Sequence, residues 1–205
     1  MHALIVVDIQ NDFVPGGSLG VAGGDEIIPI VNKLQDSFDL VVATQDWHPA
    51  DHKSFASNHQ GKKPFETMIL HGVDQVLWPD HCIQGSVGAE LHNDLNLNKV
   101  EAIFRKGMDA DIDSYSGFYD NGYKKSTGLA GYLRERKVKK LYVCGLAADY
   151  CVFYTTKDAL KENFDTYVIE DATRAIDVNG FDRAKAEILS IGGQIINTEN
   201  LHRHL

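Results

Sequence analysis

The chain has 205 residues, of which 43% are hydrophobic and 24% charged, and its formal net charge at pH 7 is -9. This length and composition fit a single globular domain with a sizeable core. The negative charge argues against general binding to nucleic acid or anionic membranes, and no apolar run is long enough to span a bilayer. The first ten residues, MHALIVVDIQ, lack the features of a secretory signal, so we expect a cytoplasmic protein.

Short runs rich in Val and Ile alternate along the chain with amphipathic segments. The nearly continuous apolar character of the first run is typical of parallel strands that are buried on both faces. In the first helical segment, Ile27, Val31 and Leu34 recur at a spacing of three or four residues, which predicts a helix. In chain order we expect strands at 3–9, 40–44, 102–106, 141–145, 166–171 and 194–198, and helices at 25–38, 126–136, 149–163 and 179–190.

This order predicts an α/β fold, in which a doubly wound, mainly parallel β-sheet carries helices on both faces of one domain over residues 1–205. The exception is an irregular insertion at about 45–98. It contains six of the nine histidines and both tryptophans. Because an irregular loop of this length is unusual in a compact domain, we expect the insertion to build a functional site.

Three reactive side chains occur at the carboxyl ends of predicted strands, where open parallel sheets bind ligands. Asp8 ends the first strand, Lys106 ends the third, and Cys151 follows the fourth. Lys106 and a helix N-terminus would favour a Cys151 thiolate, and Asp8 could take and return a proton. Backbone N–H groups of Ala147 and Cys151 could hold an oxyanion. The combination predicts amide hydrolysis through a thioester.

Each of these residues also has an ordinary structural interpretation, and only their combination favours catalysis. A cysteine among apolar residues usually belongs to the core, which we expect for Cys144, whereas the role of Cys82 stays open. The odd number of cysteines excludes a complete set of internal disulfides. Two classes of phosphate-transferring enzyme are excluded because each lacks a required residue. A phosphatase loop of the Cys-x5-Arg type that begins at Cys151 would need arginine at the position of Lys157, and a dehalogenase-like phosphotransferase would need a second aspartate, two residues after Asp8, at the position of Gln10.

A metal site is predicted in the insertion. Asp46 and His48, in TQDWHP, point the same way in an extended segment, and His81 could supply a third ligand. One carboxylate and two imidazoles suit Zn²⁺, Fe²⁺ or Mn²⁺, with water at the open positions. Four other histidines of the insertion are competing candidates for metal ligands, although we expect most of them to lie on the surface: His52, His59, His71 and His92. We expect His202 and His204 to lie in a mobile C-terminal tail.

Six short segments carry a resemblance to a known family: VVDIQNDFVPGG, TQDWHP, LWPDHCIQGS, FRKG, YSGF and VCGLAADYCV. Together they resemble nicotinamidases of the isochorismatase-like cysteine hydrolase superfamily. The matches cover residues 4–153, and the pairing of DWHP with WPDHC is the most specific of them. The resemblance implies a catalytic triad of Asp8, Lys106 and Cys151, metal ligands Asp46, His48 and His81, substrate-lining residues Phe13, Trp78 and Tyr115, and a non-proline cis peptide at Leu146–Ala147.

The activity implied by the resemblance is hydrolysis of nicotinamide to nicotinate and ammonia in NAD salvage, with pyrazinamide as a second substrate. The resemblance also implies one divalent metal ion, for which zinc is expected first and iron or manganese are the alternatives. Ser54 stands where some relatives have a further histidine ligand, so we expect three protein ligands and water.

The expected partner is the small-molecule substrate, not nucleic acid or membrane, and homo-oligomer formation stays open. The alternatives are another amide or carbamoyl hydrolase of the superfamily, a metallohydrolase in which Cys151 is structural, and a non-catalytic binding protein.

Overall fold

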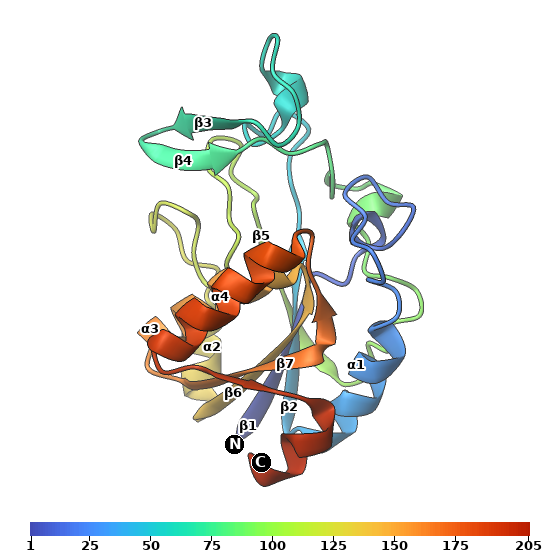
Figure 1. Ribbon diagram of the computed structural model, residues 1–205, viewed down its shortest axis with the longest axis vertical. Helices are drawn as coiled ribbons and strands as arrows, with labels where there is room; N and C mark the ends of the chain where they lie inside the picture. Colours follow the sequence, from blue (N-terminus) through green and yellow to red (C-terminus); the bar gives the residue numbers. More distant parts are fainter.

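The computed structural model describes residues 1–205 and is built around a six-stranded sheet (Figure 1). The strand order is β5-β2-β1-β6-β7-β8, and every neighbouring pair is parallel. This confirms the expected doubly wound, parallel α/β fold. The strands are β1 (His2–Val7), β2 (Leu40–Asp46), β5 (Val100–Lys106), β6 (Lys140–Leu146), β7 (Asp165–Arg174) and β8 (Gln194–Ile196).

The central strands form because their residues favour extended backbone and are apolar on both faces. In β1, every residue from Ala3 to Val7 is fully buried, and all seven residues of β2 are buried. Each fully buried Val, Leu or Ile side chain contributes about 1.5–3 kcal/mol relative to its exposed state. At the sheet edge, β5 instead alternates between exposed and partly buried residues, as expected of a strand covered on one face.

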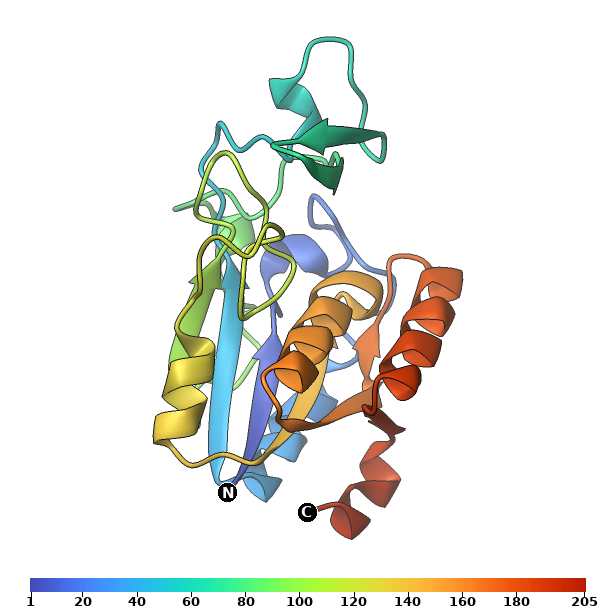
Figure 2. The same cartoon turned by 90° about the vertical axis from the view of Figure 1, so that its left-hand side faces the viewer.

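Helices cover both faces of the sheet (Figures 1 and 2). One core contains Val31 of α1 together with Leu201 near the C-terminus, and the other contains Leu133 of α2 and Ile188 of α4. The first helix is shorter than expected and has Pro29 in its first turn, where the missing N–H costs no helical hydrogen bond. The helices are α1 (Ile28–Leu34), α2 (Leu129–Glu135), α3 (Phe153–Lys161) and α4 (Val178–Ser190).

The insertion is only partly irregular, because it contains an antiparallel hairpin that the sequence analysis missed. The hairpin consists of β3 (Thr67–Leu70) and β4 (Val73–Val76), and His71 and Gly72 turn with φ of 50° and 83°. Positive φ at both turn residues matches the twist of a two-residue hairpin. The hairpin projects beyond the end of the sheet, at the top of Figures 1 and 2.

The C-terminal segment is docked on the protein, so the expectation of a mobile tail was wrong. A 3₁₀ helix spans Thr198–Arg203. The carbonyl of His204 accepts hydrogen bonds from Lys140 Nζ at 2.6 Å and from the Tyr142 hydroxyl at 2.5 Å. The His204 ring also lies 5.3 Å from the ring of Tyr167. These contacts hold the tail at the amino end of the sheet, away from the carboxyl ends.

No helix is both long and apolar enough to cross a membrane.

The strand order reverses between β1 and β6, which places two predicted site residues side by side. Asp8 follows β1 directly, and Cys151 lies five residues beyond the end of β6. The next two strands outward, β2 and β5, end in Asp46 and Lys106, which are register partners. Four predicted site residues therefore meet at one sheet edge, where open α/β sheets bind their ligands.

Candidate active site

The Lys106 ammonium group is the centre of this cluster and is inaccessible to solvent. Its Nζ lies 2.8 Å from Asp8 Oδ2, 2.7 Å from Asp46 Oδ1 and 3.4 Å from Cys151 Sγ, and it donates to the Ser114 carbonyl at 3.0 Å. The attraction of both carboxylates raises the pKa of Lys106 well above its usual value although burial lowers it. The side chain is therefore a fixed cation shared by two carboxylates and a sulfur.

Asp8 has one oxygen fixed and one oxygen free to take a proton. Thr44 Oγ1 donates to Asp8 Oδ1 at 2.6 Å, whereas Oδ2 faces Lys106 but accepts no well-aligned hydrogen bond. Burial raises the pKa of Asp8, and Lys106 opposes this shift only in part. A carboxylate whose pKa is shifted toward neutrality is suited to exchange protons with a neighbouring group.

Cys151 lies in a π-helical turn, Ala148–Val152, that joins β6 to α3. This turn replaces the α-helical start expected at 149, and π-helical turns recur at functional sites. The Cys151 sulfur lies within 4.8 Å of carboxylate oxygens of Asp8 and Asp46. Burial raises the pKa of Cys151 well above its usual value, and Lys106 lowers it less. Burial therefore outweighs the expected stabilisation of a thiolate by Lys106 and favours the thiol form of Cys151.

The backbone before Cys151 forms part of the cavity wall at Ala147. The Leu146–Ala147 peptide is cis, as the resemblance implied. The Ala147 N–H has no hydrogen-bond acceptor within the protein, and Ala147 lines the cavity beside Cys151. Gly145 has φ of 113°, and a Cβ there would lie 2.1 Å from the Val7 carbonyl oxygen. Only glycine therefore allows β6 to approach β1 this closely.

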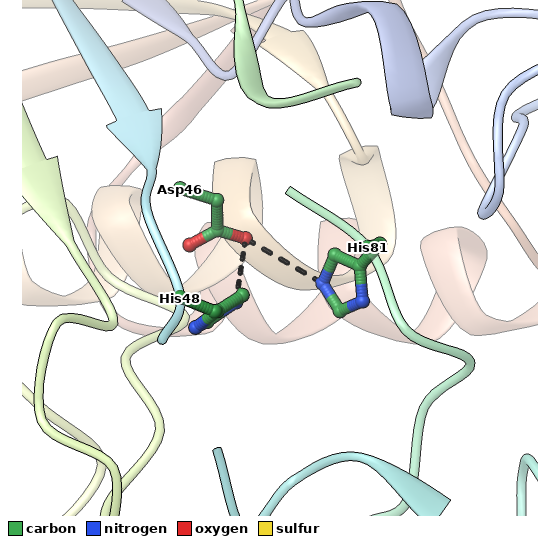
Figure 3. A group of neighbouring side chains, drawn as sticks. All are labelled: Asp46, His48 and His81. Carbon is green, nitrogen blue, oxygen red and sulfur yellow. Dashed lines mark ion pairs between the residues drawn. The ribbon is translucent and has the colours of Figure 1, made fainter. Parts of the chain in front are cut away.

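Asp46, His48 and His81 form a candidate metal site (Figure 3). Asp46 Oδ2 lies 3.5 Å from His48 Nε2 and 3.8 Å from His81 Nε2. The Nδ1 atoms of His48 and His81 each lie 2.8 Å from a backbone carbonyl, of Gly107 and Pro79 respectively. Because a carbonyl only accepts, each Nδ1 carries the hydrogen and each Nε2 presents a lone pair. His48 Nε2 is buried without a partner, so these residues fit a cation.

The electrostatics of Asp46 and His81 agree with a cation site, whereas the Asp46 carboxylate raises the pKa of His48 although burial lowers it. Burial raises the pKa of Asp46, but Lys106 and His48 lower it by more, so the carboxylate stays ionised. Burial and His48 lower the pKa of His81 to about 4, which keeps this imidazole neutral and able to bind a metal. Gly107 makes room for the His48 ring, because a Cβ there would lie 2.3 Å from His48 Cε1.

A small cavity of about 20 Å³ opens beside Cys151 and the candidate metal site. The ring of Trp78 lies 6.2 Å from Tyr115 and 4.8 Å from Tyr150, in both cases edge to face, and Phe13 closes another side. These faces suit a flat aromatic ligand. The structure thus brings Phe13, Trp78 and Tyr115 together at the cavity, as expected, and it adds four lining residues that the sequence analysis missed: Leu19, Asp113, Tyr150 and Ile176.

His52 is the exception to the expectation that most of the other histidines of the insertion lie on the surface. It is fully buried, its ring centroid lies 4.3 Å from that of His48, and its Nδ1 lies 2.7 Å from Ser54 Oγ. Ser54, which stands where some relatives have a further histidine ligand, therefore contacts His52. By contrast, His71 is exposed, and His59 and His92 are partly buried, away from the site.

Comparisons with known proteins identify the family of the chain. A family model described as the isochorismatase domain matches residues 2–200. A nicotinamidase of Acinetobacter baylyi is 53% identical over 200 residues, which cover 97% of this chain and 94% of the relative.

Solved structures are similar over almost the whole chain. A nicotinamidase and pyrazinamidase of Acinetobacter baumannii has a TM-score of 0.95 and 51% identity, with 98% of this chain and 97% of the other covered. A pyrazinamidase of Pyrococcus horikoshii in complex with zinc has a TM-score of 0.79 and 40% identity, with coverages of 96% and 98%. The chain therefore belongs to the isochorismatase-like superfamily and, within it, to the nicotinamidase family.

Proposed function

We propose that this protein hydrolyses nicotinamide to nicotinate and ammonia, a step of NAD salvage. One observation carries the proposal: a buried cysteine, an aspartate and a lysine converge beside an aromatic cavity that also borders a metal-binding trio. Family membership supports the substrate, since relatives over nearly the full length are named nicotinamidases.

We infer that Asp46, His48 and His81 hold one divalent cation. A carboxylate and two neutral imidazoles suit zinc first and iron or manganese next, and a structural neighbour contains zinc. Such an ion, when bound, would supply a Lewis-acid contact for the ring nitrogen of the substrate. The aromatic walls at Trp78 and Tyr115 would pack against the faces of the ring and leave its nitrogen free for that contact.

Bond formation begins with the Cys151 thiol. Asp8 Oδ2, which accepts no aligned hydrogen bond in the resting site, takes the thiol proton while the sulfur attacks the carboxamide carbon. Lys106 stabilises the sulfur during this transfer because its ammonium lies 3.4 Å away. The Ala147 and Cys151 N–H groups stabilise the oxyanion of the tetrahedral intermediate.

Collapse of this intermediate breaks the carbon–nitrogen bond. Asp8 returns the proton to the leaving nitrogen, so that ammonia departs and a thioester remains on Cys151. Asp8, again a carboxylate, then takes a proton from a water molecule as its oxygen attacks the thioester carbon. Collapse of the second tetrahedral intermediate breaks the carbon–sulfur bond, Asp8 returns that proton to the Cys151 sulfur, and nicotinic acid leaves and ionises to nicotinate. Pyrazinamide differs from nicotinamide by one ring nitrogen in place of a C–H group, so the same cavity would accept it.

Ammonia release from nicotinamide tests the proposal in wild type, Cys151→Ala, Cys144→Ala and Asp46→Ala. We expect activity in wild type and Cys144→Ala and none in Cys151→Ala, because Cys144 is buried within β6, with its thiol 3.8 Å from the Ile5 carbonyl. We also expect Asp46→Ala to raise KM. Full activity in Cys151→Ala would instead support a metallohydrolase, and no activity in metal-loaded wild type would point to another amide or carbamoyl substrate.

A further inference from the structure

Asp113 is a buried carboxylate that the proposed reaction does not use. It is only 4% exposed and lines the cavity together with Cys151. One of its oxygens lies within 4.8 Å of ring nitrogens of His48 and His52. The carboxylate therefore lies beside His48, one of the candidate metal ligands.

Hydrogen bonds fix the orientation of Asp113. The Ser114 N–H donates to Oδ1 at 2.7 Å, and Gln75 Nε2 donates to Oδ2 at 3.0 Å. Both oxygens therefore act as acceptors, as in an ionised carboxylate. Gln75 belongs to β4 and also donates to the Tyr115 hydroxyl at 2.9 Å, so the hairpin of the insertion fixes both groups.

His52 presents a hydrogen-bond donor to the same space. The Ser54 N–H donates to His52 Nδ1 at 3.2 Å, so Nδ1 is an acceptor and the hydrogen of the neutral ring is on Nε2. His52 Nε2 is buried without a partner. A ring nitrogen of His52 and an oxygen of Asp113 lie within 4.8 Å of each other without a direct hydrogen bond, which is the spacing that a bridging water fills.

Charge balance gives an independent reason for the position of Asp113. Lys106 supplies one buried ammonium to the carboxylates of Asp8 and Asp46, and Asp113 adds a third buried carboxylate that forms no ion pair. Uncompensated buried charge is costly, and a divalent cation between two neutral imidazoles would balance it. Without Asp113, the same ion would leave the site with an excess positive charge.

We propose that Asp113 and His52 form an outer layer of the metal centre. In this layer Asp113 balances the charge of the divalent ion, and Asp113 and His52 together hold a water molecule on its open side. Both are positioning residues, because they act through water and charge and not through a bond to the metal. The inference rests on the metal centre proposed above and assigns it a charge-balancing residue.

Zinc affinity tests the outer layer in the full-length chain. Metal-free wild type, Asp113→Asn and His52→Phe are titrated with Zn²⁺ in competition with a chromophoric chelator, and Co²⁺ loading gives a visible spectrum that reports coordination. We expect Asp113→Asn to weaken Zn²⁺ binding about 10- to 100-fold, as removal of outer partners of metal ligands does, and to change the Co²⁺ spectrum. His52→Phe, which keeps a ring beside His48, is expected to weaken binding in the same direction.

Asp120→Asn is the matched control. Asp120 is also buried, and its carboxylate accepts hydrogen bonds from backbone N–H groups of Gly122, Lys124 and Lys125 in the same loop, away from the histidines. We expect Asp120→Asn to lower the unfolding midpoint of the metal-free protein without changing Zn²⁺ affinity. Equal Zn²⁺ affinity in wild type and Asp113→Asn overturns the outer layer alone. Failure of wild type to bind Zn²⁺ or Co²⁺ at one ion per chain overturns the metal centre itself.

Discussion

Replacing Lys106 by methionine should destabilise the protein strongly. The change keeps the apolar stem but removes the ammonium that lies 2.8 Å from Asp8 and 2.7 Å from Asp46, all three side chains being buried. Removing one partner of a buried ion pair costs about 3–5 kcal/mol, because the remaining charge stays in the interior. For a chain of this length, each kcal/mol lowers Tm by about 2–4 °C, so we expect a decrease of about 6–20 °C.

Lys99→Met is the matched control, since Lys99 forms a 2.6 Å pair with Asp36 on the surface, where both side chains are exposed. Such a pair contributes about 0–1 kcal/mol. Urea unfolding at pH 7 should be measured on chelator-treated protein, so that no bound ion compensates for the lost charge. If Lys106→Met loses no more stability than Lys99→Met, Lys106 does not neutralise two buried carboxylates and our account of the site is wrong.

Two further predictions concern the backbone of the site and the state of the sulfur. Gln10 Nε2 donates to the carbonyls of Asp46 and Ala89 while Oε1 accepts from the Asp46 N–H, so Gln10→Glu should cost about 1–3 kcal/mol or more in urea unfolding. An unchanged unfolding midpoint would contradict this role. Because burial raises the pKa of Cys151, alkylation of substrate-free protein by iodoacetamide should accelerate steadily from about pH 7 to about pH 9 while Cys144 stays unlabelled. A rate plateau near neutral pH would instead indicate a preformed thiolate.

The parallel sheet could be predicted because burial on both faces leaves a direct trace in the sequence. Runs such as ALIVVDI have no polar face, and that pattern belongs to central strands. The β3–β4 hairpin was missed for the opposite reason. Its strands have only four residues each, TMIL and VDQV, and polar and apolar residues do not alternate along them, so their sequence does not indicate strands.

The site was predictable where strand topology brings residues together and not where the loops do. Asp8, Asp46 and Lys106 lie at strand ends, and a parallel sheet necessarily places neighbouring strand ends side by side. The burial of His52 and the position of Asp113 depend on how the insertion packs against the segment after β5, which no local pattern encodes. Tyr150 had a usable signal, since it directly precedes Cys151 in a segment already assigned to the site.

A covalent intermediate on Cys151 is the most direct test of the proposed reaction. Wild-type protein is mixed with nicotinamide, quenched in acid within its first turnovers, digested and analysed by mass spectrometry. We predict a nicotinoyl group in thioester linkage on the peptide that contains Cys151, which disappears when hydroxylamine is added before digestion. Steady turnover without any acyl group on Cys151, under quenching that preserves a synthetic thioester of the same peptide, would contradict the mechanism.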